Sequence, residues 1–225
     1  QFRPGGVAPA ARARPRDRLP DHLDPDGARR YPGTDEKFLG MLGMHGTYEA
    51  NLAMHECDVM ICVGARFDDR ITGRLDAFSP FSKKIHIDVD ASSINKVVKV
   101  DVGIVGDCAS VLADMLEAWR ALPSRPDKSN LDPWFQKISA WKARDCLAYW
   151  PSGTIIKPQY AVQRLYEACK DRETYITTEV GQHQMWAAQY FKYDEPNRWM
   201  TSGAWHDGLR PAGGDRHAAR ASERW

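Results

Sequence analysis

The chain has 225 residues, of which 43% are hydrophobic and 27% are charged, and its formal net charge is +1. This balance gives no electrostatic reason to expect a nucleic-acid partner. No apolar run approaches the roughly 20 residues that a membrane-spanning helix requires. The five cysteines form no CxxC pair, which favours reduced thiols over disulfides or a zinc site. Composition therefore predicts a cytoplasmic protein that binds neither nucleic acid nor membrane.

The two ends differ in composition from the interior. Residues 1–30 contain seven arginines and residues 204–225 contain four, yet all eleven lysines lie from Lys37 to Lys192. Lysine-free stretches rich in Arg, Ala, Pro and Gly are what a GC-rich gene yields when it is read out of frame. A flexible basic tail at each end is the alternative. We expect both end segments to be non-native or disordered.

After the first end segment, the chain alternates short apolar runs with helical patterns. Runs rich in β-branched residues predict buried parallel strands, and these are residues 59–65, 84–90 and 102–107. Helices are predicted before and between them, at residues 47–56, 71–78, 92–98 and 109–122. Strands and helices that alternate at this spacing predict an α/β domain with a Rossmann-like parallel sheet, over residues 31–122.

A second α/β unit is predicted after a segment rich in Pro, Ser and Asp. We interpret residues 123–157 as a linker because of that composition, although residues 134–147 are amphipathic. Pro158 opens a predicted helix because proline fits the first helical turn. A strand at 174–181 and a helix at 183–191 follow. Residues 158–203 are therefore predicted to begin a second domain.

Polar residues gather where the predicted strands end. Arg66, Asp68 and Arg70 follow the first strand, Asp88 and Asp90 close the second, and Gly106 with Asp107 closes the third. Ligands bind beyond the carboxyl ends of strands in open parallel sheets, where a carboxylate accepts from a ribose and arginine contacts phosphate. The pattern favours a nucleotide site without a GxGxxG fingerprint. Solvated salt bridges are the alternative for residues 66–70.

Two glycine-containing turns add weaker signals. Residues 41–47 precede a predicted helix, whose backbone amides could bind an anion, although a lone histidine such as His45 is more often structural. Gln182 and His183 follow Gly181 at a turn from a strand into a helix. A packed turn is the alternative explanation there.

These motifs together resemble the catalytic subunits of acetolactate synthase (acetohydroxyacid synthase), a family that uses thiamine diphosphate. The resemblance covers residues 31–203 and rests on GMHGT at 43–47, GARFDDR at 64–70 and GQHQMW at 181–186. It implies that residues 31–122 are the C-terminal part of a central FAD-holding domain. It also implies that residues 158–203 begin the thiamine-diphosphate-binding domain.

The resemblance carries over individual cofactor-binding residues. The implied FAD contacts are His45, Gly46, Thr47, Gly64, Ala65, Arg66, Asp68, Arg70, Asp88, Val89, Asp90, Gly106 and Asp107. The implied thiamine diphosphate contacts are Val180, Gly181, Gln182 and His183, and Glu179 stands where many members have Asp. The family's catalytic glutamate and its Mg²⁺ motif have no match in this chain, so we expect no catalytic and no metal-binding residue here.

The family condenses pyruvate with pyruvate or 2-ketobutyrate, with loss of CO2, in the biosynthesis of valine, leucine and isoleucine. The resemblance implies the cofactors thiamine diphosphate, Mg²⁺ and FAD, a homodimer of catalytic subunits and a small regulatory subunit. We expect the isolated chain to be an inactive fragment. Codons chosen for residues 21–30 and 206–217 re-phase to sequences similar to the family's, so we interpret both ends as frame-shifted. A non-catalytic FAD-binding module and another carboligase, such as glyoxylate carboligase, are the alternatives, and pyruvate oxidase shares the plan.

Overall fold

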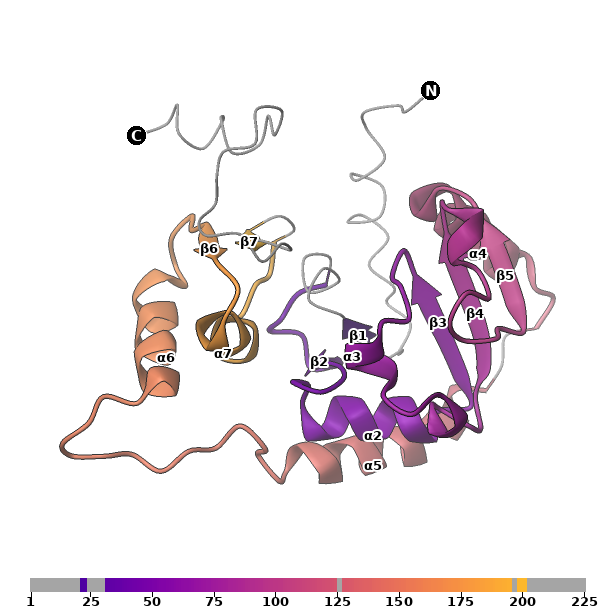
Figure 1. Cartoon of the computed structure of the whole chain (residues 1–225). Helices are drawn as coiled ribbons and strands as arrows, with labels where there is room; N and C mark the ends of the chain where they lie inside the picture. Colours follow the sequence, from indigo (N-terminus) through magenta and orange to yellow (C-terminus); the bar gives the residue numbers. More distant parts are fainter. Residues whose placement is uncertain (1–20, 24–30, 125–126, 196–197, 202–225) are drawn as a thin grey trace, which may run out of the picture. The chain divides into compact units, whose positions relative to one another are not determined.

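The computed structural model describes residues 21–23, 31–124, 127–195 and 198–201, which form two compact units (Figure 1). The first unit contains the described residues up to Trp150 together with those from Lys192 to Glu195. The second contains residues 151–191 and 198–201. Within these ranges, every helix is too short or too polar to span a lipid bilayer.

A three-stranded parallel sheet forms the framework of the first unit. Its strands β3 (Val59–Val63), β4 (Lys83–Asp88) and β5 (Val102–Val105) lie in the order β3-β4-β5. Ile61 pairs with Ile85, and Ile85 pairs with Val102. Because such β-branched side chains pack well on a pleated surface, these runs form strands. The sheet confirms the predicted α/β fold class.

The described residues of the first unit form four α-helices (Figure 1) and three short 3-10 helices. The α-helices are α2 (Tyr48–Glu56), α3 (Asp69–Thr72), α4 (Cys108–Ala121) and α5 (Asp132–Lys142). The 3-10 helices are η2 (Leu75–Ala77), η3 (Ala91–Ser93) and η4 (Lys128–Leu131). The structure thus has helices where residues 47–56 and 109–122 predicted them.

Two predicted helices are shorter in the structure. Residues 71–78 form only the end of α3 and then η2, because α3 ends at Gly73, whose φ of 55° and ψ of -122° are not helical. Residues 92–98 form only the end of η3. Asn95 then takes a left-handed φ of 61°, and its side chain accepts a hydrogen bond from Val100 N at 2.9 Å. Both helices were predicted from periodicity, which does not reveal such local turns.

A cluster of apolar side chains packs against one face of the sheet. Phe67, Phe78 and Val98 are buried there, and Met60 and Cys62 of β3 pack against them. The rings of Phe67 and Phe78 meet edge to face with centroids 5.8 Å apart, an arrangement that aromatic quadrupoles favour. This cluster anchors the segment between β3 and α3 to the sheet.

A second core lies between α2 and α5. Ala50 and Ala53 of α2 are fully buried, and Ile138 and Trp141 of α5 pack against them together with Leu39. The two alanines allow the helices to approach closely. The structure therefore places α5 in the first unit, where the sequence predicts a linker over residues 123–157. The amphipathic pattern of residues 134–147 indicates an apolar stripe, but it does not reveal which core that stripe covers.

The last residue of α5 ties the helix to the chain before strand β2 (Phe38–Met41). The ammonium group of Lys142 donates to the carbonyl oxygens of Glu36 and Phe38, the latter at 3.0 Å. Burial lowers the pKa of Lys142, against the opposing effect of nearby carboxylates. These hydrogen bonds join α5 to the start of β2, in addition to the apolar packing of α5 against α2.

One short strand lies within the segment predicted to be non-native. Residues Asp21–Leu23 form β1, which pairs in parallel with β2 across an irregular register. These three residues therefore differ from the expectation for residues 1–30. The remainder of that segment, and all of residues 204–225, lie outside the described residues.

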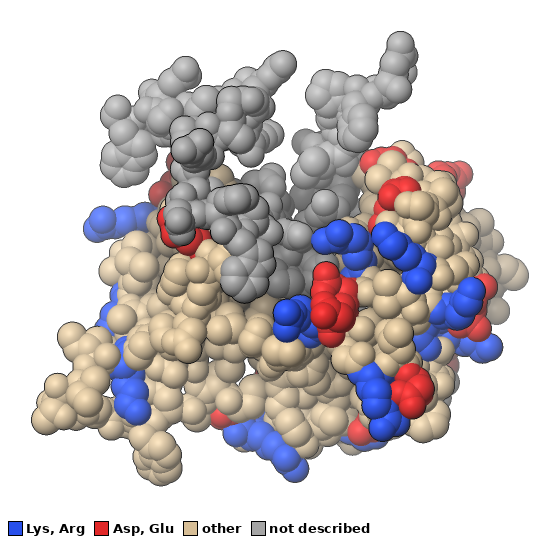
Figure 2. Space-filling view, in the orientation of Figure 1, with Lys and Arg blue, Asp and Glu red and all other residues tan. Residues whose placement is uncertain are grey.

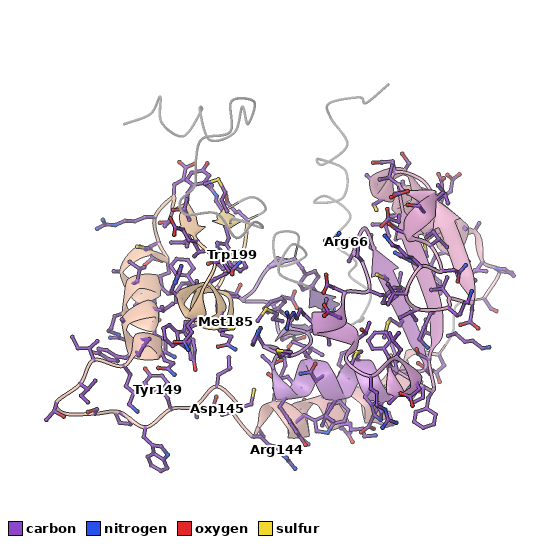
Figure 3. All side chains as sticks on the ribbon, viewed as in Figure 1. Arg66, Arg144, Asp145, Tyr149, Met185 and Trp199 are labelled. Carbon is purple, nitrogen blue, oxygen red and sulfur yellow. The ribbon has the colours of Figure 1, made fainter. Side chains whose placement is uncertain are left out.

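The second unit contains a two-stranded parallel sheet and two helices. These elements are α6 (Pro158–Cys169), β6 (Ile176–Thr178), α7 (Gln182–Tyr190) and β7 (Trp199–Thr201). Strand β6 pairs with β7, which the sequence did not predict. Trp199 is 1% exposed, and its indole N–H donates to the Thr178 hydroxyl at 3.1 Å (Figure 3). The buried Trp199 therefore fixes this small sheet.

A short segment between α7 and β7 belongs to the first unit. Gly33 N donates to Tyr193 O at 2.8 Å, and both the amide and the hydroxyl of Thr34 donate to Asp194 Oδ1 at 2.9 and 2.8 Å. Residues 192–195 therefore belong to the first unit, although the sequence predicts that residues 158–203 begin a second domain. These are contacts between residues about 160 positions apart, which local sequence patterns do not encode.

Candidate cofactor sites

The carboxyl ends of the three strands lie side by side in the first unit. Gly64 N donates to Ile87 O at 2.7 Å, and Gly106 N donates to Asp88 O at 2.9 Å. These bonds continue the sheet by one residue past β3 and β5. The structure therefore brings together the strand ends that the sequence predicted as a nucleotide site, with Ala65 and Arg66 following Gly64, and Val89 and Asp107 following the neighbouring ends.

The loop that contains His45, Gly46 and Thr47 lies against the start of α3. Met44 N donates to Arg70 O at 2.8 Å. A Cβ atom on Gly43 would lie 2.4 Å from the same oxygen, and Gly43 has φ +92°, so only glycine fits there. The loop that contains the HGT motif therefore contacts the end of the arginine-containing motif at Arg70.

Four of the predicted site residues use their side chains as helix N-caps. Thr47 accepts from Ala50 N, Asp68 from Arg70 N, Asp90 from Ser92 N and Asp107 from Ser110 N. The amide and hydroxyl of Ser92 lower the pKa of Asp90, which stabilises its carboxylate form. In the structure these residues therefore shape the turns at the strand ends, and a capping role accounts for their presence without a ligand.

The two arginines of the motif remain exposed. Arg66 lies in the segment between β3 and α3 (Figure 3), and no hydrogen bond or ion pair to its guanidinium is found among the described side chains. Arg70 Nε is 3.9 Å from Asp69 Oδ1, and both side chains are more than 60% exposed, so this ion pair contributes little. The arrangement leaves guanidinium donors available to an anion.

A cavity of about 340 Å³ opens beside Arg66. This volume lies within the range of about 300–1,000 Å³ that is usual for small-molecule sites. Its polar lining comprises two cationic groups, two carboxylates and two hydroxyls, which belong to Arg66, Lys96, Asp68, Asp69, Thr72 and Ser93. Guanidinium and ammonium donors suit a phosphate group, so this donor set fits part of a nucleotide cofactor. Ser93 and Lys96 were missed because residues 92–98 were read as a helix.

Charged side chains are interspersed on the face of the first unit shown in Figure 2. Lys and Arg residues in blue lie next to Asp and Glu residues in red. The first unit also contains ion pairs between neighbouring side chains, such as Arg74 with Asp76 at 2.7 Å and Lys83 with Asp101 at 3.1 Å. The cavity follows the same mixed pattern, because Arg66 and Lys96 line it together with Asp68 and Asp69.

Asn51 fixes the loop from Gly43 to Thr47, although the sequence did not single it out. Its Oδ1 accepts from Gly43 N at 2.9 Å, and its Nδ2 donates to Gly43 O at 3.0 Å. Both hydrogen-bonding groups of one backbone residue are thus satisfied by one side chain of α2. An asparagine on a helix has many possible partners, so no sequence signal could have identified this one.

Replacing Asn51 with alanine is expected to lower the free energy of unfolding by about 1–3 kcal/mol, since two hydrogen bonds contribute about 0.5–1.5 kcal/mol each. Urea denaturation monitored by circular dichroism measures this change. Asn51→Asp keeps the acceptor but sets a carboxylate oxygen against Gly43 O in place of the donor, so it should not recover the stability of the unmodified chain. Unchanged stability in Asn51→Ala would show that the loop does not depend on this contact.

The second candidate site is the turn from β6 into α7. Gly181 has φ +153°, and a Cβ atom there would lie 2.9 Å from Cε1 of the His183 ring. No side chain in the described part of this unit caps α7, and Gln182 and His183 are exposed. The first-turn amides of a helix bind anions. A diphosphate therefore fits this turn, which also includes Val180.

Gly181→Ala is expected to weaken thiamine diphosphate binding by about 5- to 100-fold. The reason is that a strained backbone costs of order 1–3 kcal/mol, and relief of the strain would move the turn. Gly153→Ala is a matched control in the same unit, because a Cβ atom there meets nothing within 4 Å. Isothermal titration calorimetry measures both affinities. An affinity of Gly181→Ala equal to that of Gly153→Ala would contradict this role.

Comparison with known proteins assigns the two candidate sites to different domains of one kind of enzyme. Residues 19–115 match the family described as thiamine pyrophosphate enzyme, central domain, and residues 179–209 match its C-terminal TPP binding domain. The chain belongs to the thiamine pyrophosphate enzyme family. The match confirms the predicted resemblance and makes thiamine diphosphate the cofactor of the family to which the chain belongs.

The chain is also similar to individual proteins that are named acetolactate synthases. The chain is 45% identical to the acetolactate synthase isozyme 3 large subunit of Escherichia coli (strain K12) over 79% of its own length and 31% of that protein. It is 46% identical to the acetolactate synthase large subunit of Haemophilus influenzae (79% and 30%), and 42% identical to acetolactate synthase 1, chloroplastic, of Nicotiana tabacum (79% and 26%). The chain thus spans about 30% of the length of the bacterial relatives.

Proposed function

We propose that this chain is part of an acetolactate synthase large subunit. Such an enzyme condenses pyruvate with pyruvate or 2-ketobutyrate, releases CO2, and serves the biosynthesis of valine, leucine and isoleucine. The observation that carries the proposal is 42–46% identity to proteins of this name over 79% of the chain. The two matched family domains, over residues 19–115 and 179–209, include both candidate sites.

FAD is proposed to bind at the carboxyl ends of β3, β4 and β5. The exposed Arg66 and the cavity it shares with Lys96 support this placement. Arg66 and Arg70 would contact the diphosphate, while the loop 45–47 and the strand ends at 64–65, 88–90 and 106–107 would surround the rest. Asp68, Asp90 and Asp107 would act through the turns that they cap.

Thiamine diphosphate is proposed to bind its diphosphate at the turn formed by Val180, Gly181, Gln182 and His183. When bound, the cofactor supplies the carbon nucleophile of the reaction. The residues of this chain hold and orient it through the first-turn amides of α7. Mg²⁺ belongs to the proposed enzyme, but the described residues contain no group of three or more His, Cys, Asp or Glu side chains placed to hold a metal. No metal ligand is therefore assigned here.

The proposed enzyme assembles as a homodimer of catalytic subunits with a small regulatory subunit. Two of the relatives are named large subunits, which supports a smaller partner. We propose a cytoplasmic location, which the five free cysteines support. Pyruvate and 2-ketobutyrate are the proposed substrates.

A chimera tests the proposed function. The matching 177-residue region of the Escherichia coli large subunit is replaced by this sequence, and acetolactate formation from pyruvate is measured with all three cofactors. We expect acetolactate to form, and we expect the isolated 225-residue chain to form none, because it spans 31% of that relative.

The same assay separates the alternatives. A chimera that binds both cofactors but condenses glyoxylate and not pyruvate would identify glyoxylate carboligase chemistry. A chimera that binds FAD and forms no product from either substrate would support a non-catalytic FAD-binding module. The unmodified Escherichia coli subunit serves as the positive control for folding and cofactor loading.

A further inference from the structure

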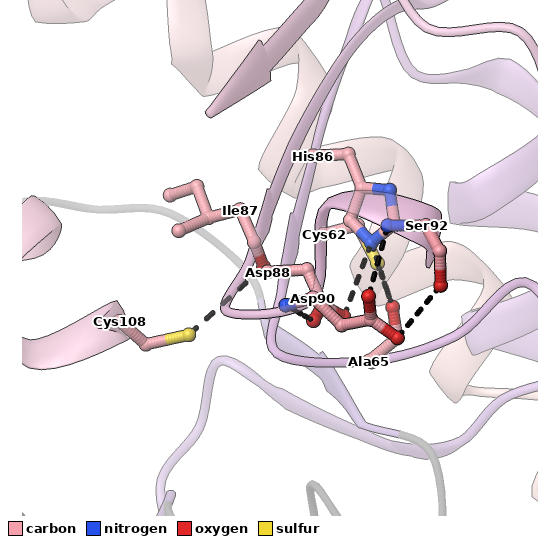
Figure 4. Close-up of polar contacts among 8 residues, drawn as sticks. All are labelled: Cys62, Ala65, His86, Ile87, Asp88, Asp90, Ser92 and Cys108. Carbon is pink, nitrogen blue, oxygen red and sulfur yellow. Dashed lines mark hydrogen bonds and ion pairs between the residues drawn. The ribbon is translucent and has the colours of Figure 1, made fainter. Parts of the chain in front are cut away.

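Two side chains converge on a single carbonyl oxygen at the end of β3 (Figure 4). His86 Nε2 lies 3.0 Å from Ala65 O, and the Cys62 thiol donates to the same oxygen at 3.0 Å. His86 is 0% exposed. Cys62 and His86 are paired residues on adjacent strands, so their side chains reach Ala65 from the same face of the sheet.

The Ala65 carbonyl lies at the point where the chain leaves the sheet. Gly64 is the last residue of its segment to hydrogen-bond with β4, and its φ of 60° turns the chain out of the sheet. The Ala65 carbonyl therefore has no strand partner, and a buried acceptor without a donor is costly. It directly precedes the nitrogen of Arg66, so whatever holds it also sets the direction in which Arg66 leaves the sheet.

The imidazole of His86 can donate here in only one tautomer. Nε2 must carry the proton to donate to Ala65 O, and Nδ1 is then an acceptor. Nδ1 is buried and has no hydrogen-bond partner among the residues that the structure describes. A proton on Nδ1 would leave a buried donor unpaired and place the Nε2 lone pair against the carbonyl oxygen. Asp88 Oδ2, 3.8 Å from Nε2, also favours the Nε2 proton.

We propose that His86 and Cys62 are positioning residues for the FAD site: together they hold the Ala65 carbonyl and thereby aim Arg66 at the cavity. This inference rests on the proposed function. His86 does not line the cavity, and its ring packs edge-on against Phe67 with centroids 5.1 Å apart. It therefore acts through the backbone at residues 65 and 66 and does not touch the cofactor.

Two matched pairs of variants separate the hydrogen bond from side-chain bulk. The amide nitrogen of glutamine can occupy the place of Nε2, so His86→Gln keeps a donor, whereas His86→Leu keeps bulk and loses it. In the same way, Cys62→Ser keeps a donor and Cys62→Ala removes it. The cysteine pair keeps the proposal testable if His86→Leu does not fold.

FAD affinity of the 225-residue chain is measured by quenching of flavin fluorescence. We expect His86→Leu and Cys62→Ala each to weaken binding by about 3- to 10-fold, the effect of one hydrogen bond. His86→Gln and Cys62→Ser should stay within about twofold of the unmodified chain. Affinities equal to that of the unmodified chain in all four variants would overturn the proposal. Equal losses in the two members of each pair would also overturn it, because they would indicate packing alone.

Nitrogen-15 spectroscopy of the histidine rings distinguishes failure of this proposal from failure of the FAD site. The His86 signals, assigned by their loss in His86→Gln, should show the Nε2-protonated tautomer, and His86→Leu should shift the Arg66 amide. If the chain shows both results but does not bind FAD, the hydrogen bonds to the Ala65 carbonyl are supported and the FAD site is refuted. An Nδ1-protonated tautomer would overturn the hydrogen bond from His86 to Ala65.

Discussion

Arg66→Ala is expected to weaken FAD binding by about 10- to 150-fold. Arg66 is exposed in the segment that follows β3 and lines the cavity beside the strand ends. A hydrogen bond to a charged group contributes about 1.5–3 kcal/mol, which corresponds to that change in affinity. A titration that follows the quenching of flavin fluorescence measures the affinity of each variant.

Arg74→Ala is the matched control for this experiment. The Arg74 side chain is 80% exposed, pairs with Asp76 at 2.7 Å, and does not line the cavity. The structure ends α3 at Thr72, so Arg74 lies beyond the helix that the sequence placed it on. We expect its affinity for FAD to change by less than about twofold, since exposed ion pairs contribute little. If Arg66→Ala and the unmodified chain bind FAD with equal affinity, residues 66–70 are a cluster of surface charges and not part of the FAD site.

Trp141→Ala is expected to lower the free energy of unfolding of the first unit by about 3–5 kcal/mol, the usual cost of truncating a buried tryptophan. Trp141 is 9% exposed and packs among the residues that join α5 to α2. Trp134 lies edge-on to it with ring centroids 5.7 Å apart. Urea denaturation monitored by circular dichroism measures the loss.

Trp150→Ala provides the same substitution at an exposed position. The Trp150 side chain is 87% exposed, so its truncation should change stability by less than about 0.5 kcal/mol. A loss in Trp141→Ala no larger than that in Trp150→Ala would mean that α5 does not belong to the first unit. Residues 132–142 would then revert to the linker that the sequence predicted.

The strands and the meeting of their carboxyl ends could be predicted because both depend on short-range signals. An apolar run such as Val59–Val63, closed by a glycine, can pack in few ways, and parallel strands bring their carboxyl ends to one edge of the sheet. The structure accordingly places Gly64, Asp88 and Gly106 next to one another. The turn at Gly181 was identified for the same reason.

The remaining features depend on contacts between distant residues. The apolar stripe of α5 was visible, but its partner α2 lies about 80 residues earlier. The pairing of Asn51 with Gly43, and of His86 with Ala65, follows from packing that no local pattern encodes. The resemblance implies that Asp90 contacts FAD, and the structure shows that its side chain caps η3. A short acidic residue before a helix serves either role, so sequence alone could not separate them.

The most direct test of the FAD site is a titration of the 15N-labelled 225-residue chain with FAD, followed through its glycine amides. Gly46, Gly64 and Gly106 lie in the three segments that the site joins, whereas Gly153 lies in the second unit with open space around it. We predict saturable shifts for the first three amides and none for Gly153. Unchanged signals for Gly64 and Gly106 at saturating FAD would contradict the placement of the cofactor at the strand ends.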